Sequence, residues 1–141
     1  MRRLFGFSLL TLAVAFGINL LAANEKPTPE YQDIMKSNAA TNAALPAHIK
    51  AQDYDAIAMD AVTLKGNFAK AEAFFTLKKV PAAVDIAIAA GKAATDLGAA
   101  ARAKNDAAIE AARAAVTPNC GGCHKQFREQ LPDKTYEIKL P

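Results

Sequence analysis

Apolar residues recur at alternating steps of four and three between residues 57 and 75 of this chain. Such spacing places side chains on one face of an α-helix, because the helix turns once every 3.6 residues. A similar series runs through the last quarter of the chain and includes both cysteines. Packed amphipathic helices are therefore predicted, with two buried faces: Ile57, Ala61, Leu64, Phe68, Ala71 and Phe75, and Ile109, Ala112, Val116, Cys120, Cys123, Phe127 and Leu131.

The composition favours helices over a sheet. The 141 residues include 33 alanines, which stabilise helices, whereas the β-branched residues typical of strands are few. This length suits one domain. Charged residues make up 22% of the chain and the formal net charge is +3. These values exclude the composition of a disordered chain and that of a strongly basic nucleic-acid-binding protein.

Capping residues and prolines divide the chain after residue 28 into four helical stretches. Thr28 can cap the first helix, with Pro29 at its first position. We place this helix at residues 29–45, because Pro46 should end or kink it. The starts of the other three stretches are marked by Asp53, Pro81 and Asn105.

Short connections between these stretches imply an all-α fold, an antiparallel four-helix bundle at residues 29–131. Residues 24–28 before the bundle are expected to be flexible. Residues 132–141 form a C-terminal tail for which no partner element is predicted. Three apolar residues in this tail alternate with polar ones, as in a short strand: Tyr136, Ile138 and Leu140.

Helical periodicity also predicts the inward faces of the first and third helices. These faces hold Ile34, Met35, Asn38, Ala39 and Asn42 in the first helix and Val84, Ile88, Gly91, Ala94 and Gly98 in the third. In the fourth stretch Pro118 either kinks the helix or begins a new helix capped by Thr117. Both alternatives keep residues 120–130 helical.

Residues 1–23 have the features of a secretory signal peptide. Arg2 and Arg3 precede an apolar run at residues 4–23, which ends in small residues suited to cleavage. An uncleaved membrane anchor is the alternative, since about 20 apolar residues span a bilayer, but no stop-transfer charges follow the run. We therefore expect export to the periplasm and no membrane insertion after cleavage.

The sequence Cys-Gly-Gly-Cys-His at residues 120–124 carries the chemistry of the chain. On a helix, Cys120, Cys123 and His124 share nearly one face, because they are three and four residues apart. This pattern is typical of covalent haem attachment, in which each thiol adds to one vinyl group and the imidazole binds iron. Gly121 and Gly122 leave space beside the ring edge, at a cost of about 1 kcal/mol each in helix propensity. One haem c per chain, attached through both cysteines, is therefore expected.

Two other interpretations of this motif are a redox disulfide and a zinc site. A redox disulfide normally lies between a strand and a helix, in a βαβ pattern that this sequence lacks. Zinc needs four ligands, and the distant His48 would have to complete a set with Cys120, Cys123 and His124. Haem attachment is favoured over both by the export signal and by the helical setting of the motif.

With these features the chain resembles the class II c-type cytochromes, the cytochrome c-prime family, over residues 29–130. The resemblance rests on the Cys-Gly-Gly-Cys-His motif late in an all-helical chain, followed by Phe127 and Arg128. It also rests on the Tyr-Gln-Asp-Ile-Met sequence of the first helix, at residues 31–35. It implies one haem near the C-terminus, contacts of Phe127 and Arg128 with that haem, and a homodimer packed through the first two helices.

The chain departs from the usual family pattern in three places. Tyr31 stands where a basic residue is frequent, Phe127 stands where tyrosine is usual, and residues 131–141 extend beyond the usual end of the chain. Arg128 would offset a haem propionate or, as an alternative, act as an exposed cation at the helix end.

Met35 separates two functions that the resemblance implies. In low-spin relatives a methionine at this position is the sixth iron ligand, and such a haem suits one-electron transfer between redox partner proteins. In high-spin relatives the residue only packs, and five-coordinate iron binds nitric oxide or carbon monoxide. We expect Met35 to be the axial ligand opposite His124, although a helical methionine is more often a core filler and periodicity does not separate Met35 from Ile34.

The leading hypothesis is a periplasmic monohaem cytochrome that carries single electrons. The sequence contains no nucleophile–base pair and no phosphate-binding loop. We therefore expect neither an enzyme nor a nucleic-acid-binding protein.

Overall fold

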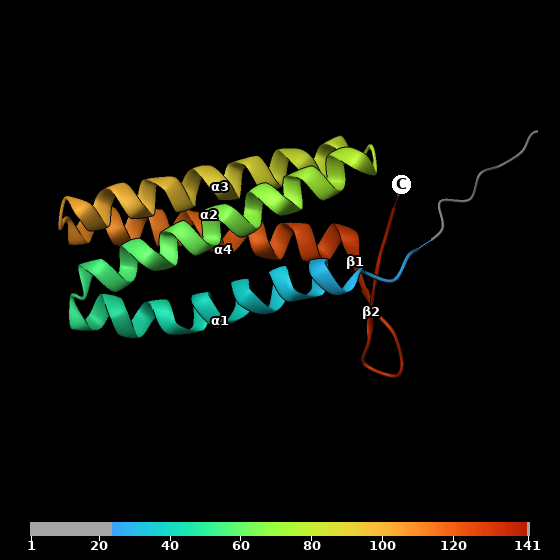
Figure 1. Cartoon of the computed structure of the whole chain (residues 1–141), viewed down its shortest axis with the longest axis horizontal. Coiled ribbons are helices and arrows are strands. Elements are labelled where there is room, and N and C mark those ends of the chain that lie inside the picture. Colours follow the sequence, from blue (N-terminus) through green and yellow to red (C-terminus); the bar gives the residue numbers. More distant parts are fainter. Residues whose placement is uncertain (1–23, 141) are drawn as a thin grey trace, which may run out of the picture.

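The computed structural model describes residues 24–140, which form four helices packed against one another and a small two-stranded sheet (Figure 1). The mostly helical fold confirms the all-α prediction. In chain order the elements are α1 (Pro29–Ala51), α2 (Tyr54–Leu77), α3 (Pro81–Arg102), α4 (Asp106–Phe127), β1 (Arg128–Gln130) and β2 (Tyr136–Ile138).

The predicted capping residues start three of the four helices. The Thr28 hydroxyl oxygen accepts a hydrogen bond from the Tyr31 amide at 3.2 Å. The side chains of Asp53 and Asn105 accept equivalent bonds from amides three residues later, both at 3.0 Å. Each cap satisfies a backbone donor that the helix leaves unpaired. α3 has no side-chain cap and starts at Pro81, which has no N–H to satisfy.

Prolines lie inside two helices. The prediction that Pro46 ends the first helix at residue 45 is wrong, because α1 continues to Ala51. Leu45 and Ile49, on either side of the proline, both pack against the core. Burial of Leu45, which is 1% exposed, contributes about 1.5–3 kcal/mol, and with the partial burial of Ile49 it offsets much of the roughly 3 kcal/mol cost of an internal proline. α4 also continues through Pro118, so no new helix begins there.

α2 and α3 pack closely through small side chains. The predicted α2 face is confirmed, since all of its residues are buried. The predicted α3 face is partly wrong, because Ile88 is 49% exposed and alanines nearby are buried instead. Small residues let the two backbones approach: a Cβ added to Gly98 would lie 3.2 Å from the Cβ of Ala61. The buried α3 residues are Ala83, Ala87, Ala90, Ala93, Ala94, Leu97, Gly98, Ala100 and Ala101.

A β-hairpin follows α4. The helix ends at Phe127, so the prediction of helix to residue 130 is wrong. β1 pairs antiparallel with β2, which corrects the expectation of a tail strand without a partner. The pairing brings Ile138, which is 4% exposed, into an apolar cluster with Tyr31 and Phe75. This burial compensates for ending the helix early.

The hairpin is also joined to residues 24–28 before α1. This segment was predicted to be flexible. Glu25 and Ile138 exchange two backbone hydrogen bonds, of 3.0 and 2.7 Å. The Glu25 carboxylate forms an ion pair at 2.6 Å with Lys78, which directly follows α2. The two ends of the described chain therefore meet beside α1 and α2.

No helix within residues 24–140 is long and apolar enough to cross a membrane. The predicted signal peptide at residues 1–23 lies outside the described residues. Its cleavage and the export of the chain therefore stay predictions.

The α2 face offers a matched test of this core. Leu64 is 0% exposed, whereas Leu77 at the end of the same helix is 83% exposed. Leu64→Ala should lower the free energy of unfolding by about 2–5 kcal/mol, because it leaves a cavity in the core. Leu77→Ala should change it by no more than about 0.5 kcal/mol. Urea denaturation followed by circular dichroism measures both values, and equal losses would contradict the assigned face.

Candidate functional site

Two cavities border α1 and α4. Every close helix packing within residues 24–140 joins helices adjacent in the chain: α1 with α2, α2 with α3, and α3 with α4. The inner cavity, of about 370 Å³, is lined by all four helices. The outer cavity, of about 320 Å³, is lined mainly by α1, the end of α4 and the hairpin. The residues that line both are Tyr31, Met35, Ala39, Phe75, Cys123 and His124.

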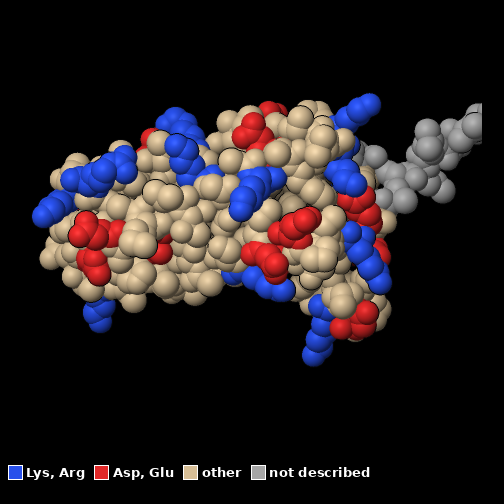
Figure 2. All heavy atoms as spheres, in the orientation of Figure 1, with Lys and Arg blue, Asp and Glu red and all other residues tan. Residues whose placement is uncertain are grey.

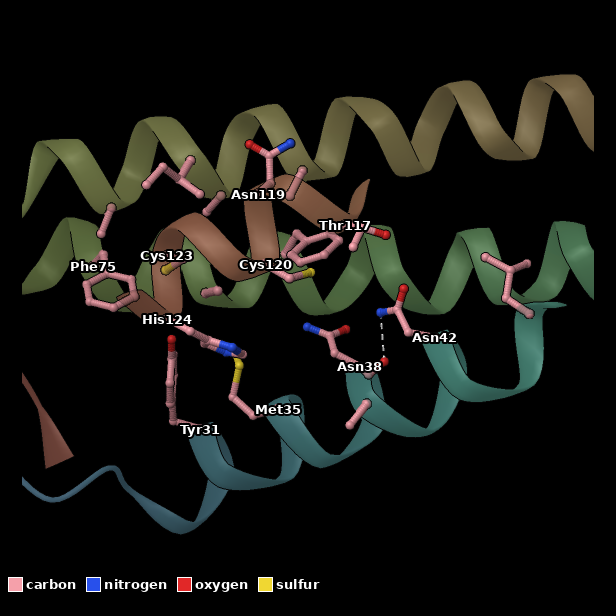
Figure 3. Close-up of a pocket in the computed structure, with 18 of the residues that line it drawn as sticks. Tyr31, Met35, Asn38, Asn42, Phe75, Thr117, Asn119, Cys120, Cys123 and His124 are labelled. Atoms are coloured by element: carbon pink, nitrogen blue, oxygen red, sulfur yellow. Dashed lines mark hydrogen bonds between the residues drawn. The ribbon is translucent and has the colours of Figure 1, made fainter. Parts of the chain in front are cut away.

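The predicted face of α4 carries the two thiols to these cavities. Ile109, Ala112 and Val116 are buried as predicted. Farther along the helix, Cys120 and Cys123 are only partly buried, and neither forms a disulfide. Cys120 lines the inner cavity and Cys123 lines both (Figure 3).

The glycines between the thiols are not required by packing within the protein. A Cβ added to Gly121 or Gly122 would meet nothing within 4 Å among the described atoms. The helix therefore bears the cost of two glycines without a close neighbour in the chain. The open space beside the motif leaves room for an external group to approach this turn.

Burial makes both thiols weak acids. It raises the pKa of Cys120, and it raises the pKa of Cys123 to about 11, with a further contribution from the neighbouring Cys120. Thiols of redox enzymes instead have lowered pKa values, because the thiolate is the nucleophile. The environment of this pair therefore argues against thiol–disulfide exchange as its function.

His124 follows Cys123 and lines both cavities. Burial, and then the positive charge of Arg128, lower the pKa of its imidazole. A neutral imidazole at neutral pH is the form that binds metals. Within residues 24–140 neither ring nitrogen forms a hydrogen bond to the protein. Both nitrogens are thus open to the surroundings of the ring.

Met35 lies on the opposite wall. Its side chain extends from α1 toward His124, as Figure 3 shows, and it lines both cavities. Ile34 lines neither cavity, so the structure distinguishes two neighbours that helical periodicity left equivalent. The structure thus brings Met35, Cys120, Cys123 and His124 to one place from opposite ends of the sequence.

Phe127 and Arg128 lie at the outer cavity. The Phe127 ring packs on Phe75, with centroids 5.8 Å apart. Arg128 begins β1, and its guanidinium lies 4.5 Å from the centroid of the Tyr136 ring. Arg128 is exposed and is also the C-cap residue of α4, so a contact with a haem propionate and the role of a helix-end cation both stay predictions.

Some lining residues were not identified as site residues from the sequence. Tyr136 and Ile138 of the tail line the outer cavity, and Tyr31 and Phe75 line both cavities. The alternation of apolar residues in the tail was the available signal, but it did not reveal which surface the strand would cover. Tyr31 was noted only in relation to a family pattern, within the Tyr-Gln-Asp-Ile-Met sequence and as a departure from a frequent basic residue.

A zinc site receives no support from the arrangement. His48, which would have supplied the missing ligand, contacts Asp60 instead, with its Nδ1 atom 2.7 Å from the carboxylate. Among the described residues no group of three or more histidine, cysteine or acidic side chains could hold a metal ion. The zinc hypothesis therefore lacks its fourth ligand.

The raised thiol pKa values predict slow alkylation in the folded chain. With both thiols free, Cys123 should react with iodoacetamide at pH 8 roughly 100-fold more slowly than in urea, because far less of it is thiolate. The folded-state rate should climb as the pH approaches 11, the pKa of Cys123. Peptide mass spectrometry at timed intervals measures the rate at each cysteine. Equal rates for the folded and unfolded chains would contradict the assigned burial.

Comparison of the chain with protein-family models gave no match. Comparisons with curated proteins and with solved structures gave none either. The interpretation of the site therefore rests on the chemistry and placement of its own residues.

Proposed function

We propose that this chain is a periplasmic monohaem c-type cytochrome that carries single electrons between redox partner proteins. One observation carries the proposal. Cys120, Cys123 and His124 of α4 face Met35 of α1 across two adjoining cavities. Such a gap between two helices of a bundle is a common place for a cofactor, because side chains of both helices point into it.

The residues present fit a haem. Both cavities are predominantly apolar, and each volume lies within the range of about 300–1,000 Å³ found for ligand pockets. Cys120 and Cys123, one helical turn apart, match the spacing needed for two thioether bonds. The imidazole of His124 and the thioether of Met35 are a known pair of axial ligands.

Each side chain has a distinct part in holding the group. Bound haem would supply a one-electron couple between ferric and ferrous iron. Cys120 and Cys123 tether it to α4, and neutral His124 provides a nitrogen ligand. Met35 provides a sulfur ligand that stabilises the reduced state and raises the reduction potential. Apolar neighbours such as Phe75 exclude water.

A second candidate is a five-coordinate protein that binds nitric oxide or carbon monoxide. The two cavities that Met35 borders favour it, because they leave room for a small ligand beside this side chain. In that case Met35 only packs in the cavity and His124 is the one protein ligand.

Export, the antiparallel order of the helices and a homodimer are further parts of the proposal. Residues 1–23 would direct export, and the short connections support an antiparallel order of the four helices. A homodimer through α1 and α2 is consistent with Met59 and Val62, which are 71% and 66% exposed on α2. Basic and acidic side chains alternate over the face shown in Figure 2, so charge on this face does not define a redox partner.

Covalent attachment tests the role of the thiols. When expressed with a cytochrome c maturation system, the parent chain should keep its haem through denaturing electrophoresis, detected by peroxidase stain. The Cys120→Ser/Cys123→Ser variant should lose it completely, because both tethers are removed. A parent chain that shows no stain although it is exported and folded would overturn the proposed function.

Met35 and Met59 offer a matched comparison of axial ligation. Met35→Ala should abolish the far-red sulfur-to-iron absorption band, lower the reduction potential and allow carbon monoxide to bind. Met59→Ala should leave all three properties unchanged, since Met59 is exposed on α2. Optical spectra and a redox titration measure these effects. If the parent is high-spin and Met35→Ala matches it, the five-coordinate candidate replaces the electron carrier.

A further inference from the structure

The α1 wall of the cavities carries two polar groups to which the proposed function assigns no role. They are the hydroxyl of Tyr31, a residue 8% exposed, and the amide of Asn38, a residue 6% exposed. Tyr31 lies four residues before Met35 and Asn38 three residues after it, so the three side chains share one helix face. Two buried polar groups therefore flank the methionine that faces His124.

Neither group is fully paired with protein atoms within residues 24–140. The Tyr31 hydroxyl has no hydrogen-bond partner there, although its ring is held by Phe74 and Phe75 at centroid distances of 4.4 and 5.9 Å. The side-chain oxygen of Asn38 accepts a hydrogen bond from the Asn67 side chain at 3.0 Å. The side-chain amide hydrogens of Asn38 have no partner among the described residues. Figure 3 shows the Tyr31 oxygen and the Asn38 nitrogen directed into the space between α1 and α4.

Most other polar side chains along the cavities donate at least one hydrogen bond within the protein. Most donate to backbone carbonyls or to a neighbouring side chain, as for Gln32, Asn42, Arg113, Thr117 and Asn119. Among the described residues no fully buried side-chain nitrogen or oxygen lacks a hydrogen-bond partner, so the unpaired Tyr31 hydroxyl and Asn38 amide nitrogen are accessible from the inner cavity. The hydroxyl of Tyr31 and the amide of Asn38 are therefore suited to bind an acceptor that comes from outside the chain.

We propose that Tyr31 and Asn38 form a hydrogen-bonding site for a small acceptor ligand, of the size of a diatomic or triatomic anion, beside Met35. The inference rests on the proposed function, because it concerns the face of the haem that α1 covers. The methionine side chain has three rotatable bonds and turns aside without moving the helix. With Met35 turned aside, donors on both sides select ligands that accept hydrogen bonds over ligands that do not.

Azide, a small anion that accepts hydrogen bonds, is the probe. All variants are made in the Met35→Ala protein, because this substitution removes the methionine side chain and leaves both donors unchanged. Azide is titrated into the ferric protein and followed by absorbance. Tyr31→Phe, added to this background, should weaken azide binding roughly tenfold, the effect of one lost hydrogen bond. Asn38→Ala should act in the same direction. Because phenylalanine keeps the ring, packing on Phe74 and Phe75 is preserved.

Two controls separate a hydrogen bond from a general disturbance. Tyr54→Phe makes the same chemical change far from the cavities, at a tyrosine whose hydroxyl bonds Asp106, and should leave azide affinity unchanged. Carbon monoxide, a weak acceptor, should bind the ferrous forms of all variants within about twofold of the Met35→Ala protein.

The possible results test the ligand site separately from the proposed cytochrome function. Azide affinity within twofold of the background in both the Tyr31→Phe and Asn38→Ala variants would overturn the ligand site and leave the cytochrome proposal standing. Equal losses for azide and carbon monoxide would also overturn it, because they indicate altered access instead of hydrogen bonding. Absence of covalent haem from the background protein would overturn both.

Discussion

Close packing of α2 against α3 is the constraint on which the rest of the structure depends. Alanines line the interface, and at Gly98 the backbones are so near that one added carbon would lie 3.2 Å from Ala61. α1 packs on α2 and α4 packs on α3. Because these outer helices are each held by a different member of the tight pair, they border the cavities without packing closely on each other. Bulky α2 residues, Phe68 and Phe75, line the space that remains.

The chemistry of the site follows from that separation. Cys120, Cys123 and His124 occupy one wall because they continue the apolar face of α4, so the packing that orients this helix also orients the motif. Partial burial keeps the thiols protonated and favours the neutral imidazole. These properties differ from those of a site that carries out thiol catalysis. Met35 supplies sulfur from the other wall.

The C-terminal hairpin closes one end of this arrangement. Ile138 is buried against Tyr31 and Phe75, and its backbone bonds to Glu25, so the tail joins α1, α2 and the segment before α1. Residues of β1 and β2 form part of the wall of the outer cavity. The C-terminal tail, for which the sequence predicted no partner element, therefore lines part of the site.

Periodicity and capping residues in the sequence determined the four helices, the buried α2 face and the turn that carries Cys120, Cys123 and His124, because these depend on neighbours within one or two turns. Only the tertiary structure decided that α1 passes through Pro46, that alanines and not Ile88 pack inward on α3, and that the tail forms a hairpin. Each of these depends on burial against residues distant in sequence, which a local pattern does not encode. The same holds for the site: the motif was visible in the chain, but the placement of Met35, Tyr31 and Asn38 across from it required α1 and α4 to be positioned by the helices between them.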